Sequence, residues 1–154
     1  NTANNEETFR GGIMLIEFPN IVKGLRKAIG DYSKTAVGKK VLADRTPSVN
    51  DSYTNDIAKC PCVTVEEKVN VALAKGREID NSETLSRLMY EVNLYDNLSN
   101  KVEVCYKLAN VVNDYFMGLQ IQNMRFIRIT CEPIANTANA NIYRIIMRFE
   151  NKNI

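Results

Sequence analysis

Four cysteines are the residues of this sequence with the most potential for chemistry: Cys60, Cys62, Cys105 and Cys131. The pair around Pro61 invites a metal or redox interpretation, but zinc sites usually separate two cysteines by two to four residues and need two further ligands. The chain has no histidine, which excludes Ser-His and Cys-His catalysis and His-based metal sites. A secreted disulfide scaffold of this length normally carries more cysteines. We therefore expect reduced thiols and no metal or other cofactor.

Two of these cysteines fall within apolar patterns. Cys105 lies on the apolar face of a predicted helix, and Cys131 alternates with Ile127 and Ile129 along a predicted strand. Cysteine behaves as a small hydrophobic residue in such positions. We predict that both thiols are buried in the core.

The acidic residues do not form a recognisable catalytic pair, because none has a partner at a spacing that implies acid–base catalysis. Examples are Glu66, Glu67, Glu78, Asp80, Asp96 and Asp114. Gly11 and Gly12 precede a helix instead of following a strand, and Gly118 stands alone, so no phosphate-binding loop is formed. The sequence predicts neither an enzyme nor a nucleotide site.

The C-terminal segment has two contrasting faces. One is apolar and consists of Tyr143, Ile145, Met147 and Phe149. The other mixes arginine with isoleucine, and we expect residues of two earlier strands to share it. Such a mixture with methionine and tyrosine is typical of a protein interface. The candidate interface residues are Arg128, Arg144, Ile146, Arg148, Met89, Glu91 and Tyr95. The alternative is an ordinary solvated sheet face, on which Glu91 pairs with an arginine across strands.

The first part of the scaffold that positions these residues is a predicted helix. Apolar residues recur with helical spacing from Phe18 to Tyr32, Pro19 suits the first turn, and Gly30 with Asp31 suits the end. A short strand is expected at 40–44, before a polar turn segment at 48–56. A half-buried strand follows at 62–71, in which only Glu67 interrupts the inward row. The inward residues are Val63, Val65, Val69 and Val71.

The second half predicts three strands and one helix. A strand at 88–95 turns Leu88, Tyr90, Val92 and Leu94 to one side. Ser99 suits the N-cap of a helix whose apolar stripe reaches Phe116, and Gly118 suits its end. The last two strands are expected at 126–132 and 141–150. Polar connections are predicted at 75–83 and 133–140.

The order α-β-β-β-α-β-β indicates the α+β class. We expect a mostly antiparallel five-stranded sheet with two helices packed on one face. Residues 13–154 form a single domain, and the polar segment 1–12 is expected to be a flexible N-terminal arm.

Net charge excludes a strong general attraction to nucleic acid or membranes. The sequence has 20 lysines and arginines against 18 acidic residues, a formal charge of +2. No apolar run approaches the roughly 20 residues that cross a bilayer, and we expect folding in a cytoplasm.

Three stretches resemble a known family. They are Met14–Phe18 with the helix that follows, Leu88–Asp96 running into the next helix, and the final strand Ile142–Glu150. Together they are similar to the tail terminator, or tail-completion, proteins of long-tailed bacteriophages. The resemblance spans about residues 13–150 and consists of pattern and order. It departs at 50–60 and 75–83.

The resemblance implies a structural virion protein without catalytic activity. Such a subunit forms a ring, usually of six copies, that caps the head-proximal end of the tail tube, ends polymerisation and joins tail to neck. Its partners would be other copies of itself, the tail tube protein, a neck or head-completion protein and, on a contractile tail, the sheath protein. No sequence-specific nucleic acid and no membrane are implied.

Two other functions remain open at this point. One is a head-completion or head–tail joining protein of the neck, which has similar size and equally lacks catalytic residues. The other is a small α+β enzyme or ligand-binding domain, which would need a deep pocket lined by convergent polar groups.

Overall fold

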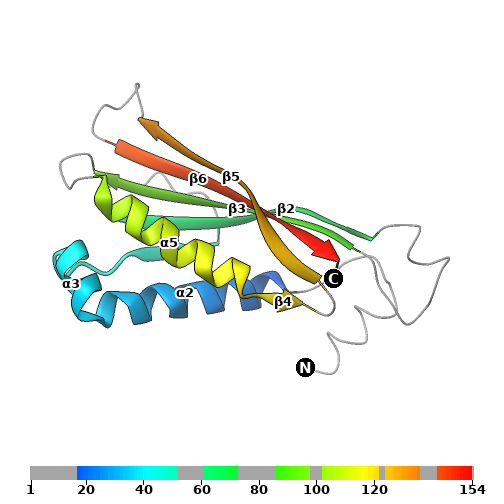
Figure 1. Cartoon of the computed structure of the whole chain (residues 1–154), viewed down its shortest axis with the longest axis horizontal. Coiled ribbons are helices and arrows are strands. Elements are labelled where there is room, and N and C mark those ends of the chain that lie inside the picture. The colour runs from blue at the N-terminus through cyan, green and yellow to red at the C-terminus, as the bar shows by residue number, and fades with distance from the viewer. Residues whose placement is uncertain are drawn as a thin grey trace.

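A computed structural model describes residues 17–51, 61–72, 86–97, 102–121, 124–135 and 142–153. Three helices and six strands lie in these ranges (Figure 1). The helices are α2 (Phe18–Lys34), α3 (Ala36–Leu42) and α5 (Glu103–Met117). The strands are β1 (Ser48–Asn50), β2 (Cys62–Ala72), β3 (Ser86–Asn97), β4 (Gln120–Ile121), β5 (Met124–Ala135) and β6 (Ile142–Asn153).

The strands form one sheet in the order β1-β2-β3-β6-β5-β4. The β1–β2 pair is parallel and all other pairs are antiparallel. The helices lie on one face, with α2 packed against α5 and α5 against the central strands (Figure 1). The expected α+β class and mostly antiparallel sheet are confirmed, whereas the five-stranded, two-helix layout differs in detail. The opposite side of the sheet, built from β2, β3 and β6, is called the uncovered face below.

Helix α2 forms where the helical spacing predicted it. Proline lies in its first turn, where the missing N–H is harmless, and one side of the helix is buried. The helix passes through Gly30, the expected end, and continues to Lys34. It ends because the backbone of Thr35 is extended, and the Thr35 hydroxyl then accepts a hydrogen bond from the Gly38 amide to begin α3.

The prediction of a strand at 40–44 is wrong, because these residues belong mainly to α3. Short apolar runs do not distinguish a strand from a helical turn. Leu42 is buried on the core side, and Ala43 and Asp44 end the helix in the left-handed conformation, at φ 51° and 62°. A Cβ at Gly38 would overlap the carbonyl of Tyr32, so this tight joint between α2 and α3 requires glycine. The missed strand β1 lies in the expected turn segment.

Strand β2 confirms the inward row only as far as its bulge. Val63 and Val65 are fully buried, but the register with β3 shifts between Glu67 and Val69. Such an extra residue reverses which side chains face the core beyond it. Val69 and Val71, expected inside, therefore lie on the uncovered face, and Val71 is 48% exposed.

The two long central strands match their predicted faces. The inward residues of β3 are buried, as are Ile145, Met147 and Phe149 of the apolar row of β6, while Tyr143 is half-buried. Aromatic rings join this row to α5, since the rings of Phe116 and Phe149 stack with centroids 4.3 Å apart. Cys105 is buried on α5 as predicted. Gly118 ends α5 at φ −91°, in the right-handed region, and the proposed Ser99 cap lies outside the described residues.

Strand β5 turns a different set of residues inward from the one predicted. Phe126 is buried, whereas Ile127 and Ile129 are 43% and 44% exposed and Cys131 is exposed. Ile127 lies opposite Glu150 on the uncovered side, and the register shifts between Arg128 and Thr130. The predicted burial of Cys131 is therefore wrong. Simple alternation fails for Ile127 because a second bulge interrupts the strand. Cys131 lies on the helix side, opposite Met147, but it is exposed there.

Several sequence predictions fall outside the described residues: the arm 1–12, Cys60 and the 75–83 connection. Among the described helices, none combines the length and apolarity needed to cross a membrane.

A buried ion pair ties the segment after α3 to the centre of the sheet. The Arg45 guanidinium lies 3.3 Å from a carboxylate oxygen of Asp96, and the Asp96 side chain is only 2% exposed. The Arg45 Nε also donates to the Leu42 carbonyl at 2.8 Å. The Arg45 side chain thus donates to a carbonyl at the end of α3 and pairs with a buried carboxylate of β3.

We expect Arg45→Ala to lower the free energy of unfolding by roughly 3 kcal/mol, because it leaves the Asp96 carboxylate buried without its cation. The control is Lys27→Ala, which removes the exposed Lys27–Asp31 pair and should change stability far less, because solvent screens such a pair. Urea denaturation followed by circular dichroism measures both. Equal losses in the two variants would contradict the anchoring role of Arg45.

Candidate interface on the uncovered sheet face

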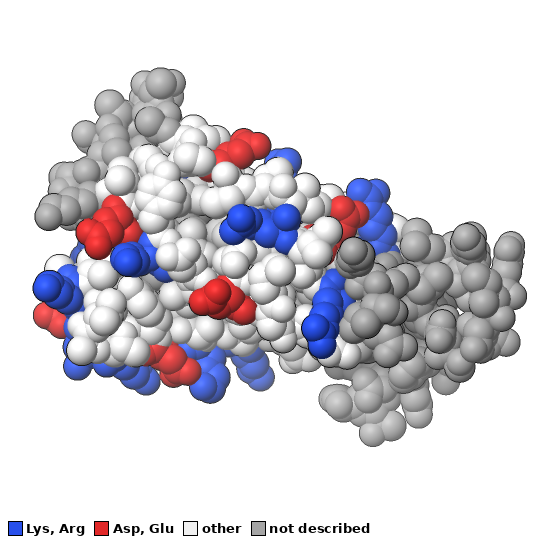
Figure 2. All heavy atoms as spheres, in the orientation of Figure 1, with Lys and Arg blue, Asp and Glu red and all other residues white. Residues whose placement is uncertain are grey.

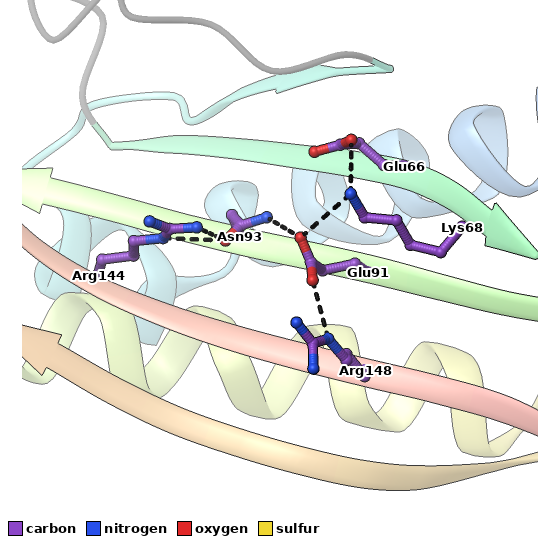
Figure 3. A network of polar contacts seen from close by, with 6 residues as sticks. All are labelled: Glu66, Lys68, Glu91, Asn93, Arg144 and Arg148. Atoms are coloured by element: carbon purple, nitrogen blue, oxygen red, sulfur yellow. Dashed lines mark hydrogen bonds and ion pairs between the residues drawn. The ribbon is translucent and has the colours of Figure 1, made fainter.

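Glu91 is the centre of a polar network on the uncovered face (Figure 3). Its carboxylate accepts a hydrogen bond from Arg148 Nε at 2.9 Å and another from Asn93 Nδ2 at 3.2 Å. Lys68 Nζ lies 3.9 Å from Glu91 and 3.1 Å from Glu66. The network therefore joins β2, β3 and β6, the three adjacent strands of this face.

A second arginine extends the network along the sheet. Arg144 donates from Nε and Nη2 to Asn93 Oδ1, at 3.0 and 2.8 Å. Its guanidinium carbon also lies 5.5 Å from the centre of the Tyr95 ring, a cation–π arrangement. Asn93 thus accepts from Arg144 and donates to Glu91, which fixes the orientation of its amide (Figure 3).

Polar groups on this face are unusually well buried. Glu91 is 6% exposed, and Asn93 and Thr64 are 1% and 0% exposed. Burial acts to raise the pKa of Glu91, but the hydrogen bonds from Arg148 and Asn93 and the charges of Lys68 and Arg148 together lower it. The carboxylate is therefore held ionised, with its neighbours fixed around it.

The structure brings six of the seven candidate residues to the uncovered face. Three belong to β3 and three to β6, paired in one antiparallel register. They are Met89, Glu91, Tyr95, Arg144, Ile146 and Arg148. The cross-strand Glu91–arginine pair of the alternative interpretation is present. However, the carboxylate at its centre is buried, unlike that of a solvated pair.

Arg128 does not belong to this group. It lies opposite Phe149, on the side of the helices, and Nη1 donates to Asn113 Oδ1 of α5 at 3.1 Å. The prediction that it lies beside Arg144 and Arg148 is wrong, because it assumed an unbroken register across the β5 bulge.

Sequence reasoning missed the contributions of Asn93 and Lys68. The alternation along β3 placed Asn93 on the same face as Glu91. It gave no sign that Asn93 joins Glu91 to Arg144. Spacing placed Lys68 with Glu66 on the solvent side of the strand, but its contact with Glu91 depends on the pairing of β2 with β3, which spacing does not reveal.

The described residues contain no group of three or more cysteine or acidic side chains placed to hold a metal ion. Cys62 and Cys105 are buried, and Cys131 is exposed. Burial, together with the hydrogen bond to Tyr106, raises the pKa of Tyr143 to about 12, so its hydroxyl stays protonated at neutral pH. The described side chains of the uncovered face are joined by hydrogen bonds and charge pairs.

No protein-family model matches this chain, and no curated protein matches it. Among solved structures, the fold is similar to that of a chain in the virion of a native gene transfer agent particle. The two chains are 13% identical and align with a TM-score of 0.52. The alignment covers 83% of this chain and 92% of the other, so the similarity in fold extends over most of both chains.

We expect Glu91→Gln to destabilise the protein by roughly 1 kcal/mol at pH 7, because it weakens charge-assisted hydrogen bonds. The pKa of Glu91 is lowered from an ordinary 4.5, so its contribution is complete above that pH and disappears as pH falls through the lowered pKa. Wild type and variant should therefore converge in acid unfolding titrations.

The control for this titration is Glu66→Gln on the same face, where the side chain is 28% exposed and bonds only to Lys68 among the pairs above. It should change stability much less at every pH. A wild-type advantage over Glu91→Gln that does not decrease as the pH falls through the acid range would contradict the proposed electrostatic role.

Proposed function

We propose that this protein is a structural subunit of a phage-like particle, acting as a tail terminator. In this role, copies form a ring on the head-proximal end of a tail tube, end its polymerisation and bind the neck. The observation that carries the proposal is the fold, which is similar over most of both chains to a chain of a gene transfer agent virion. The three sequence stretches that resemble tail terminators support the narrower role.

The uncovered face supports a role in assembly. Its arginines are held in place by Glu91 and Asn93 before any partner arrives, so little side-chain freedom remains to be lost on binding. The half-buried Met89 and Ile146 add apolar contact area between the charges. We propose that this face contacts a neighbouring subunit or a tail protein.

Proteins are better candidates than nucleic acid for this contact. The formal charge of the chain is only +2, and on the uncovered face Glu66 and Glu91 lie beside Lys68 and Arg148. Figure 2, which shows the side of the helices, also has basic and acidic side chains interspersed. Tail tube, neck and, in a contractile tail, sheath proteins are the proposed partners, with no membrane or sequence-specific nucleic acid. A protein that acts by contact in this way needs no catalytic activity or cofactor.

Deletion of the gene from the genome that encodes it tests the proposed function. Negative-stain microscopy should reveal tails of abnormal and variable length, because nothing stops the tube, and complementation should restore normal length. Tails of normal length without attached heads would indicate the neck alternative instead. Normal particles would contradict both structural roles and favour the small enzyme or ligand-binding domain.

Arg144→Glu should abolish the restoration of tail length in this complementation assay, because it reverses charge at the proposed contact. The variant should remain folded, since Arg144 bonds to an uncharged amide. Arg148→Glu is a poorer probe, as it would place a second carboxylate beside buried Glu91. The control is Lys107→Glu on the exposed side of α5, which makes the same change in charge. Normal tails with Arg144→Glu would contradict the interface assignment.

A further inference from the structure

The long strands β2 and β5 lie next to the two edges of the sheet, and the short outermost strands β1 and β4 pair with only part of each. Strand β4 pairs with β5 only at Met124 and Arg125, and β1 pairs with β2 only at 62–64. Among the described strands, none pairs with the outer edge of β5 from 126 onward or of β2 from 65 onward. An open edge presents backbone N–H and C=O groups that can accept a further strand.

The directions of the strands make these two edges complementary. From β2 through β3 and β6 to β5, each strand runs antiparallel to the one before it. Therefore β2 and β5 run in opposite directions in one subunit (Figure 1). A second copy in the same orientation would place its β2 antiparallel beside β5 of the first, with both uncovered faces on the same side. Repetition of this contact is head-to-tail, the kind that closes into a ring.

The irregularities of the edges define a register. Lys68 of β2 and Ile129 of β5 each stand where the pairing inside the subunit shifts. If both extra residues are left out of the pairing and Glu67 of one copy faces Cys131 of the next, Val69 falls opposite Thr130 and Val71 opposite Ile127. Pro133, which has no N–H to donate, then marks the end of the paired stretch. The short strands β1 and β4 lie at opposite ends of the sheet, at or beyond the limits of this stretch.

Side chains at the two edges suit this register. Val71 and Ile127 are 48% and 43% exposed, and both lie on the uncovered face, so pairing would bury two exposed apolar groups against each other. On the helix side, Glu67 of one edge lies diagonally across from Arg128 of the other, which is an opposite-charge pair. Glu132 would face Glu66, whose charge Lys68 already offsets.

We infer that copies of this protein join by antiparallel pairing of β2 residues 66–71 in one subunit with β5 residues 127–132 in the next. This inference rests on the proposed ring and names the contact that builds it. The sheets then continue from copy to copy, and the uncovered faces form one surface for a tail protein. A barrel of strands requires a stagger between neighbours, and the bulge-matched register supplies one.

Single charged substitutions at each edge test the inference. Val71→Lys and Ile127→Lys should each weaken self-association of the full chain at least about tenfold in sedimentation velocity, because a charge enters the buried pair. Both positions are about half exposed in the isolated subunit, so thermal unfolding should be nearly unchanged. The control is Val37→Lys on α3, where the side chain is 61% exposed and self-association should match wild type.

Mixing the two variants gives a sharper result. Val71→Lys keeps an intact β5 edge and Ile127→Lys keeps an intact β2 edge, so an equal mixture should form dimers that cannot grow, while each variant alone stays monomeric. The inference would be overturned if both variants still formed rings like those of the wild type. It would also be overturned if the wild-type protein stayed monomeric at tens of micromolar. The tail-length assay tests the proposed function independently of self-association. If variants that fail to pair still cap tails normally, the edge contact is refuted and the tail-terminator role is not.

Discussion

The whole arrangement depends on β3, a strand with strict alternation that is buried on both sides. Leu88, Tyr90, Val92 and Leu94 pack under the helices, while Glu91 and Asn93 are almost as inaccessible on the other face. A strand that is apolar on one side and charged on the other can take only one register, because a slip of one residue would exchange the two faces. This constraint fixes β2 and β6 beside it, and with them Lys68, Arg144 and Arg148.

The buried Glu91 carboxylate contributes less to the stability of the fold than to fixing the register of its strands. Removing Glu91 from water is costly, and Arg148, Asn93 and Lys68 offset that cost through hydrogen bonds and charge. Apolar residues in the same places could give equal stability, but they would leave an exposed apolar sheet face in the free subunit. The charged network keeps this face compatible with water while its arginines are already positioned for a partner.

Period-two and period-3.6 patterns were enough to predict α2, β2, β3, α5, β5 and β6 and to sort the faces of β3 and β6. They failed wherever one extra residue changed the parity, as at Lys68 and Ile129, so Val69, Val71, Ile127 and Arg128 were assigned to the wrong side. They also failed for α3, because a run as short as 40–44 fits both periods. The pairing of Asn93 with Arg144 depends on strands distant in the sequence, which local spacing does not reveal.

The same bulges that defeated the pattern explain how an assembling subunit can have open edges. A flat, regular edge would pair with any exposed strand and lead to aggregation. An edge with a bulge at Lys68 or Ile129 and a proline at 133 pairs well only with a strand whose own irregularity falls at the same level. Because β2 and β5 each carry one shift, the best available match is another copy of the same chain. In the proposed assembly, selectivity comes from backbone geometry at the edges and from charge on the uncovered face, two separate surfaces of one subunit.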